Sequence, residues 1–276
     1  MSAMRSPTVA SPSNPRIKST ARLRDRRDRD ATGLTLVDGA REVRRALESG
    51  ADVVEAFICE PLLAGEDARA ALGALEHRRV PTTSTSETAF AKIAFGDRAD
   101  GIVAVVRIPS MRLDDLRLPD EPLVVVVEGV EKPGNLGAVL RSADGAGADA
   151  LIAASPRTDL LNPNAIRASA GTIFSVPIAA APTDEVIDWL RARAIRIVAA
   201  LVDASPLYTD IDLTGGIAFA FGSEADGLTD AWQGPDISAV RLPMRGIADS
   251  LNVSVSAAIV LYEARRQRDA GRESPH

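Results

Sequence analysis

Cysteine and histidine are scarce in this chain of 276 residues. Cys59 is its only cysteine, which excludes an internal disulfide and any zinc or iron–sulfur site built from several thiolates. The two histidines are His77 and His276, and two imidazoles supply almost no material for a histidine-based metal centre or a Ser-His-Asp triad. Most hydrolase and metalloenzyme functions are therefore excluded, and we expect no metal.

Long hydrophobic runs are also missing. The longest, such as residues 123–127, are strand-sized, far short of the roughly 18 residues that span a bilayer. The first residues, MSAMRSPTVASPSNP, have Ser and Pro where a secretory signal would have its apolar core. The sequence therefore predicts a soluble, cytoplasmic protein with no membrane partner.

The balance of charge is acidic overall but locally basic. A net charge of −6 and a pI near 5.1 argue against nonspecific coating of nucleic acid, which depends on neutralising phosphates. Residues 16–29, RIKSTARLRDRRDR, nevertheless hold seven cationic residues against two aspartates. Such a segment on an acidic protein indicates either a nucleic-acid contact or a solvated helix face with internal ion pairs, and charge alone leaves both interpretations open.

The length and the pattern of elements predict two domains. Residues 1–108 are expected to form a small α/β domain with a disordered first dozen residues and a helix over residues 17–29. The charged, proline-containing residues 109–121 suit a linker. From residue 122 onward, apolar strands such as LVVVVE alternate with helices, which predicts a parallel sheet covered by helices.

Ligands of parallel α/β sheets bind at the carboxyl ends of strands. Three strand-to-loop junctions of the second domain therefore hold the candidate functional residues. The first, EGVEKPGNLGAVLR from Glu128, matches neither a Walker loop nor a dinucleotide fingerprint, which disfavours a nicotinamide-dependent oxidoreductase. The second, IAFAFGSEADGL, has glycines that would let the backbone approach a ligand closely. The third is RLPMRGIADSLNVSV. Taken singly, Asn135, Ser250 and Asn252 also suit simple helix caps.

Taken together and in this order, the three junctions resemble a known family. NxGxxxR from Asn135 to Arg141, FGSExxGL from Phe221, and LPMRGxxDSLNVSVSAAI from Leu242 are similar to the three motifs of the SpoU (TrmH) family of RNA ribose 2′-O-methyltransferases. SPSNPRIKSTARLRDRR followed by LTLVDGAREVRRAL resembles the substrate-binding domain of its ribosomal-RNA members. The resemblance extends over about residues 11–268, and Ala225 departs from a glycine found in many relatives.

The resemblance implies an α/β architecture with a trefoil-knotted, SPOUT-type parallel-sheet methyltransferase domain over residues 122–276. It implies S-adenosylmethionine as the methyl donor, RNA as the substrate, and a homodimer whose interface includes the final helix and the loops around Arg141 and Met244. The catalytic residues that it implies are Arg141, Asn135, Glu224, Ser250 and Asn252. The cofactor-binding residues that it implies are Gly222, Ser223, Glu224, Gly227, Leu242, Met244, Leu251 and Asn252. The expected RNA contacts are Arg16, Lys18, Arg24, Arg27, Arg141 and Arg167.

Large-subunit ribosomal RNA is the favoured substrate, because the N-terminal domain resembles that of the ribosomal members. The modification would serve either housekeeping or antibiotic resistance. Two alternatives remain at this point: a transfer-RNA ribose methyltransferase, and a catalytically silent RNA-binding protein that assists ribosome assembly with the same fold.

Overall fold

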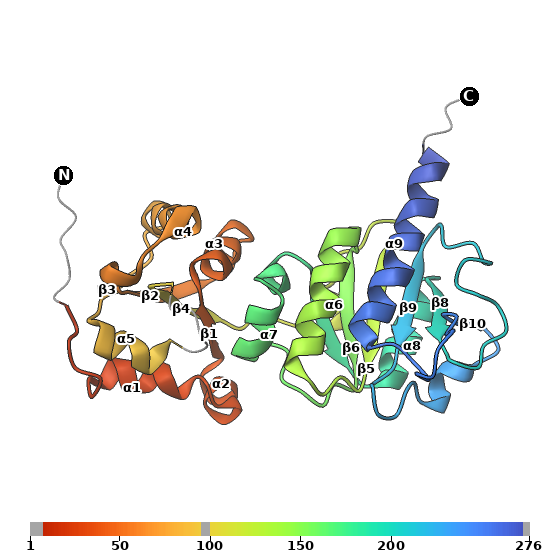
Figure 1. Cartoon of the computed structure of the whole chain (residues 1–276), viewed down its shortest axis with the longest axis horizontal. Helices are drawn as coiled ribbons and strands as arrows, with labels where there is room; N and C mark the ends of the chain where they lie inside the picture. The colour runs from red at the N-terminus through yellow and green to blue at the C-terminus, as the bar shows by residue number, and fades with distance from the viewer. Residues whose placement is uncertain (1–7, 95–99, 273–276) are drawn as a thin grey trace. The chain divides into compact units, whose positions relative to one another are not determined.

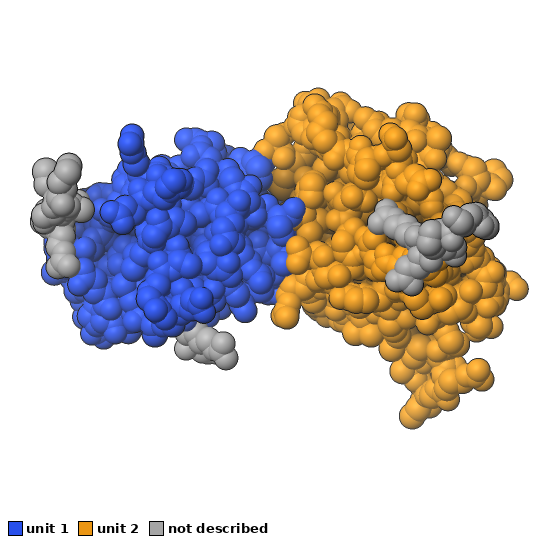
Figure 2. All heavy atoms as spheres, turned by 90° about the horizontal axis from the view of Figure 1, so that it is seen from above, with its two compact units in different colours: residues 1–109, 161–175 blue, residues 110–160, 176–276 orange. Residues whose placement is uncertain are grey.

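The protein divides into two compact units (Figure 2). The structure, a computed structural model, describes residues 8–94 and 100–272. Unit 1 comprises Met1–Pro109 and Leu161–Ser175, and unit 2 comprises Ser110–Leu160 and Val176–His276. The boundaries expected from the sequence differ from this division, because residues 110–121 pack with unit 2 and residues 161–175 pack with unit 1.

The basic N-terminal segment forms two short helices where the sequence suggested one. Helix α1 is Pro15–Arg22 and α2 is Arg26–Thr32. Arg29 explains the break: it is buried, and its guanidinium donates to the carbonyls of Leu23 (2.8 Å) and Arg24 (2.6 Å). These bonds satisfy carbonyls in the turn that separates the helices, which a continuous helix would have used internally.

Unit 1 is built on a four-stranded mixed sheet with the order β1-β4-β2-β3 (Figure 1). Its strands are β1 (Leu34–Asp38), β2 (Val53–Ile58), β3 (Thr82–Ser84) and β4 (Ile102–Arg107), and its further elements are α3 (Ala40–Glu48), η1 (Glu60–Leu62), α4 (Gly65–His77) and α5 (Glu87–Ile93). Val9 falls in the stretch expected to be disordered, yet it pairs with Thr85 beside β3. Residues 1–7 and His276 lie outside the described residues.

Residues 161–175 complete unit 1. They form α7 (Pro163–Ala168) and the 3-10 turn η3 (Thr172–Phe174). Asn162 caps α7, its side chain accepting from the backbone amide of Asn164 at 2.9 Å. Leu161, Ala165 and Ile166 are buried, so the burial of apolar side chains accounts for this placement.

Unit 2 is built on a six-stranded sheet in which every neighbouring pair of strands is parallel. The strand order is β10-β8-β9-β5-β6-β7. The strands are β5 (Leu123–Glu128), β6 (Ala150–Ala154), β7 (Ile178–Ala181), β8 (Arg196–Ala200), β9 (Ile217–Phe221) and β10 (Ile237–Val240). The other elements are η2 (Leu113–Asp115), α6 (Pro133–Ala146), α8 (Thr183–Ala192), η4 (Asp230–Gln233) and α9 (Val253–Arg272).

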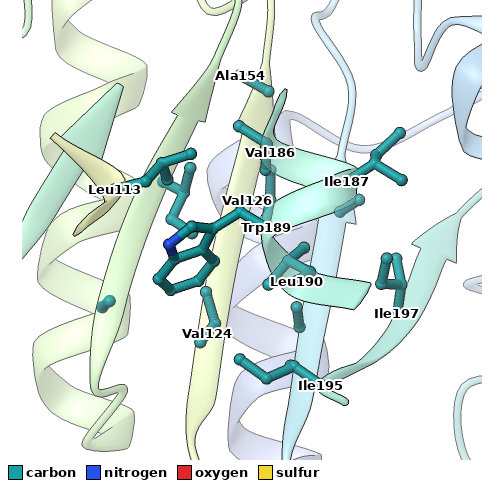
Figure 3. Packing of buried hydrophobic residues seen from close by; sticks show 14 of the residues in the cluster. Leu113, Val124, Val126, Ala154, Val186, Ile187, Trp189, Leu190, Ile195 and Ile197 are labelled. Carbon is teal, nitrogen blue, oxygen red and sulfur yellow. The ribbon is translucent and has the colours of Figure 1, made fainter. Parts of the chain in front are cut away.

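Both faces of this sheet are covered by helices. Val124 and Val126 of β5 belong to the apolar cluster that holds Trp189 of α8 (Figure 3). Alternate residues of a strand point to opposite faces, so the intervening valines of β5 point to the other face, on the side where α6 and α9 lie next to each other (Figure 1). Leu113 and Leu116 also join the Trp189 cluster, which is why the expected linker packs as part of unit 2.

The strand order reverses between β5 and β9. From β5 the chain proceeds outward through β6 and β7, whereas β8, β9 and β10 fill the opposite side of the sheet. A reversal of this kind separates the loops at the carboxyl ends of the two neighbouring strands and opens a binding position there. Within the described residues, no helix is long and apolar enough to cross a membrane.

Candidate functional site

A cavity of about 360 Å³ lies at the carboxyl ends of β8, β9 and β10. The loop after β9 and the stretch that leads into α9 contribute most of its wall. Eight residues assigned from the sequence motifs line it: Gly222, Ser223, Glu224, Gly227, Leu242, Met244, Ser250 and Leu251. Residues of the second and third motifs therefore meet at one cavity.

Gly222 is required by the loop itself. A Cβ atom at this position would lie 2.0 Å from the carbonyl carbon of Gly227 and 2.2 Å from the amide nitrogen of Leu228. The loop folds back on itself through hydrogen bonds between the backbones of Ser223 and Gly227 (3.2 and 3.1 Å), and Gly227 has a φ of +67°. The sequence suggested that glycine admits a ligand at this point, whereas the nearest atoms to the missing side chain belong to the same loop.

A buried carboxylate fixes the far end of this loop. Glu128, the last residue of β5, is 4% exposed. It accepts hydrogen bonds from the amide (2.7 Å) and hydroxyl (2.9 Å) of Thr229 and from the hydroxyl of Thr183 (2.7 Å). The loop after β9 is thus tied to the end of the neighbouring strand. Glu128 is not among the site residues expected from the sequence, although an acid at the end of an apolar strand is a visible signal.

A second cavity, of about 190 Å³, adjoins the first and shares residues 222–225 and Val253 with it. Asn135 of α6 and Glu224 both line it. The side-chain amide of Asn252 donates to a carboxylate oxygen of Glu224 and to the side-chain oxygen of Asn135, the latter at 3.3 Å. One residue from each of the three motifs therefore meets in a single polar cluster.

Lys132 completes this cluster from the solvent side. Its ammonium lies 2.5 Å from the other carboxylate oxygen of Glu224. The hydrogen bond from Lys132, followed by one from Asn135, lowers the pKa of the Glu224 carboxyl, and the hydrogen bond to Glu224 raises the pKa of Lys132. Glu224 is consequently ionised at neutral pH. Sequence reasoning missed Lys132, which precedes α6 as its N-terminal flanking residue, because a lysine before Pro-Gly-Asn carries no distinctive signal.

Asn252 caps α9 and also reaches the polar cluster. Its side-chain oxygen accepts from the backbone amide (2.9 Å) and the hydroxyl (2.6 Å) of Ser254 at the start of α9, which is the geometry of a helix cap. Its amide nitrogen is turned to Glu224. Asn135, by contrast, lies inside the first turn of α6, so it does not cap that helix as the sequence suggested.

Arg141 stands apart from both cavities. It is exposed on α6, and it does not line either cavity. It follows Asn135 by six residues, which rotates it about 240° around the helix axis. Among residues 8–94 and 100–272, no hydrogen bond or ion pair engages its guanidinium, so this group is available to an external ligand.

The expected RNA contacts of the N-terminal segment differ in how they are engaged. Arg16 forms an ion pair with Glu55 at 2.5 Å and lies over the ring of Phe57. Arg24 donates to the carbonyl of Ala94. Lys18 and Arg27 are exposed. The latter two are therefore the better placed to meet a phosphate.

Arg167 of α7 forms an ion pair with a buried acid. One of its nitrogens lies 3.2 Å from Asp38, at the end of β1, and the side chains are 26% and 0% exposed. Both residues belong to unit 1. Arg167 is thus held in place on one side and partly open to solvent.

The end of β8 is a further part of the site that sequence reasoning missed. Leu201 and Val202 line the larger cavity, and Val202 is 61% exposed. Both follow an ordinary apolar strand, so only the strand order brings them beside the loop after β9.

Comparisons with known proteins find relatives of both parts of the chain. Residues 122–262 match the SpoU rRNA Methylase family, and residues 14–104 match the MRM3-like substrate binding domain. The chain is similar to a 23S rRNA (uridine(2479)-2'-O)-methyltransferase of Streptomyces viridochromogenes, with 33% identity over 264 residues, or 91% of this chain and 89% of that protein.

Solved structures give the same result. The crystal structure of an RNA 2'-O ribose methyltransferase has 42% identity and a TM-score of 0.83, covering 95% of this chain and 99% of that one. An AdoMet-bound rRNA methyltransferase from Sinorhizobium meliloti has 29% identity and a TM-score of 0.84, covering 94% of this chain and 97% of that one.

Proposed function

The chain belongs to the SpoU rRNA methylase family, and on this basis we propose that it transfers a methyl group from S-adenosylmethionine to a ribose 2′-hydroxyl of large-subunit ribosomal RNA. The observation that carries the proposal is the pair of adjoining cavities with the ionised Glu224 between them. The Streptomyces relative is named as a 23S rRNA 2′-O-methyltransferase, which supports the substrate class. A cytoplasmic location is part of the same proposal.

The larger cavity fits S-adenosylmethionine. Its volume of about 360 Å³ lies within the usual range of small-molecule sites, about 300–1,000 Å³. Leu242, Met244 and Leu251 offer an apolar surface for the adenine ring, and the backbone of the loop after β9 offers polar groups for its edge. When bound, S-adenosylmethionine supplies a methyl group on a positively charged sulfur. The Glu224 carboxylate favours a positive charge close by.

Arg141 is the proposed catalytic arginine. A ribose hydroxyl is a poor nucleophile until its proton is removed, and a guanidinium does not give up its own proton at neutral pH. Arg141 therefore grips the phosphate and ribose oxygens and stabilises the developing alkoxide, while the phosphate or a neighbouring polar group accepts the proton. Its exposed, unengaged guanidinium supports this role. Asn135, Ser250 and Asn252 bound the space where the ribose would bind.

A homodimer is part of the proposal, because Arg141 lines neither cavity of its own chain. A second copy that brought Arg141 to the cluster of Glu224 would complete the site. Exposed apolar side chains support such an interface: Ile247 is 103% exposed, Val255 44% and Tyr262 54%. Light scattering at micromolar concentration should give the mass of a dimer, and the mass of a monomer would contradict this assignment.

The trefoil knot that the family resemblance implies also belongs to the proposal. Knotted chains are rare among proteins in general, so the knot is inferred from membership of the family. The two stretches that frame the larger cavity, residues 221–228 and 242–256, both come from the last quarter of the chain. This is where a C-terminal knot would bring the chain together.

The test of the proposed activity is methyl transfer to ribosomal RNA in vitro, compared between the parent and two variants. Arg141→Ala should lower kcat by about a hundredfold or more, as the loss of one oxyanion donor does, while the affinity for S-adenosylmethionine stays unchanged. Arg141→Lys should recover little, because a point charge cannot replace the planar fork of arginine. If Arg141→Ala methylated RNA at the parent rate with saturating cofactor, the mechanism would be wrong.

Two controls separate the alternatives. Calorimetry of S-adenosylmethionine binding distinguishes an enzyme from a silent RNA-binding protein, which has no need of the cofactor. Transfer RNA offered beside ribosomal RNA distinguishes the two substrate classes. The match of residues 14–104 to a substrate-binding domain favours ribosomal RNA.

A further inference from the structure

We infer that Asp38 is a positioning residue for methyl transfer, which orients the guanidinium of Arg167 for a phosphate of the bound RNA. The inference rests on the proposed function, in which Arg167 contacts the substrate. Asp38 is the last residue of β1, its side chain is fully buried, and it lies 3.2 Å from a nitrogen of Arg167. The guanidinium is about a quarter exposed, so it faces the buried acid and solvent at once.

Contacts other than the ion pair hold α7 in unit 1. The hydroxyl of Thr35 on β1 donates to the carbonyl of Leu161 at 2.8 Å, and the guanidinium of Arg45 on α3 donates to the carbonyl of Ala170 at 2.8 Å. Both acceptors belong to residues 161–175, and neither contact involves Asp38. The segment is therefore attached to unit 1 at both of its ends without the ion pair.

At Gly171 the backbone of residues 161–175 also lies close to α3. It has a φ of +84°, and a Cβ built on it would lie 3.2 Å from both the Cα of Glu42 and the Cβ of Arg45. The backbone of the segment thus lies directly against α3. Because the position of α7 is fixed several times over, the ion pair with Asp38 bears on where the side chain of Arg167 points rather than on where the helix lies.

The burial of Asp38 explains why this acid would hold the guanidinium of Arg167 in one orientation. An ionised carboxylate that is removed from water needs donors around it, and a cation nearby satisfies that need only in a narrow geometry. A free arginine side chain samples many rotamers, and ordering it on binding costs conformational entropy. An arginine that is already oriented avoids that cost when RNA arrives.

Asp38 and Arg167 lie in ranges of the sequence that match two different family models. Asp38 lies in the range that matches the substrate-binding domain, residues 14–104, and Arg167 lies in the range that matches the methylase, residues 122–262. An acid of the substrate-binding domain therefore orients an arginine of the methylase sequence. This domain would then contribute to the reaction beyond its own contacts with RNA.

The test is a double-mutant cycle in the full-length chain with Asp38→Asn, Arg167→Ala and the double variant. Either single change should lower kcat/KM for the RNA by about ten- to a hundredfold, the effect of losing one hydrogen bond to a charged group. The double variant should be no worse than Arg167→Ala, since Asp38 acts through Arg167. The dissociation constant of S-adenosylmethionine should stay within twofold of the parent value in all three.

Thr35→Val is the matched control. It removes the buried hydrogen bond to Leu161 with little change of shape, so it loosens the docking of the segment and leaves Arg167 paired. It should lower the melting temperature and leave kcat/KM for the RNA within twofold. Arg167→Lys is a second variant that keeps the buried acid paired; it should fold as the parent does and still lose activity, because lysine lacks the planar fork.

Three outcomes would overturn the inference: equal losses from Asp38→Asn in the parent and in the Arg167→Ala background, a loss from Thr35→Val as large as that from Asp38→Asn, or parent-like activity of Arg167→Lys. A parent protein that does not methylate ribosomal RNA would refute the proposed function instead. In that case the same cycle read as RNA affinity, by filter binding, still tests the coupling of Asp38 to Arg167.

Discussion

Replacing Gly222 with alanine should disable the cofactor cavity. The added Cβ would lie 2.0 Å from the carbonyl carbon of Gly227, whereas carbon atoms in contact are about 3.5–4.0 Å apart. The backbone on one side of the loop must therefore move by about 1.5 Å. That loop lines the larger cavity, so the cavity cannot keep its shape.

The loss of cofactor affinity in Gly222→Ala depends on the rigidity of the backbone that the new methyl group meets. Inserting atoms into well-packed structure costs about 1–3 kcal/mol, and the atoms met by the new methyl are backbone with no rotamer to change. If the bound state bears that cost, the affinity for S-adenosylmethionine falls about 5- to 140-fold, since 1.4 kcal/mol corresponds to a factor of ten. Isothermal calorimetry of the purified variant measures it directly.

Two other glycines supply graded controls. Gly134, in the first turn of α6, has no atom within 4 Å of an added Cβ, so Gly134→Ala should bind the cofactor as the parent does. Gly227 also has open space but a φ of +67°, and an alanine there is strained by about 1–2 kcal/mol. Gly227→Ala should therefore lose roughly tenfold in affinity. Parent-like binding by Gly222→Ala would refute the reasoning from loop packing.

Three further results are expected. Lys132→Ala should shift the acidic limb of the kcat/KM profile to higher pH, because Lys132 lowers the pKa of Glu224; an unchanged profile would mean that Glu224 does not act as an anion. Arg266 on α9 lowers the pKa of Glu263 from 4.5 to about 2, so the stability that this carboxylate adds, about 0.5 kcal/mol for such a helix pair, is complete above pH 4.5 and is lost as the pH falls towards 2. Denaturant unfolding of Glu263→Gln beside the parent should therefore show a difference at pH 7 that vanishes near pH 2, and a constant difference would contradict the pairing. Neutralising Lys18 and Arg27 together should reduce the salt slope of RNA binding by about 1.4 for single strands or 1.8 for a duplex, with cofactor affinity unchanged, whereas an unchanged slope would favour the solvated-face interpretation.

The sequence predicted the parallel sheet well because burial on both faces leaves a direct trace. LVVVVE is apolar at every position but the last, and β5 is buried along its whole length. The residues of the larger cavity were also predictable, because the second and third motifs each supply them from one loop, within which the spacing survives folding. The family resemblance supplied their roles; the spacing alone supplied only the loops.

Local patterns failed where a specific side-chain contact decides the structure. The break between α1 and α2 depends on where the buried side chain of Arg29 points, and helical periodicity does not record that. The packing of residues 161–175 in unit 1 depends on contacts such as that of Leu161 with Thr35, 126 positions away. The membership of Lys132 in the cluster depends on Glu224, 92 positions away.

Buried acids at strand ends mark two places in this chain where a distant segment is needed. Asp38 ends β1 and Glu128 ends β5, and both are nearly inaccessible to solvent. A buried carboxyl group is tolerated there only if hydrogen-bond partners from elsewhere reach it. Each acid is therefore accompanied by a second segment of chain, α7 for Asp38 and the loop after β9 for Glu128. The sequences LTLVD and LVVVVE thus predict that another segment contacts the terminal acid, but they do not indicate which segment it is. An acid that closes an apolar strand is therefore a place to search for a segment that the site depends on, and in this chain both such segments carry residues assigned to the methyl-transfer reaction.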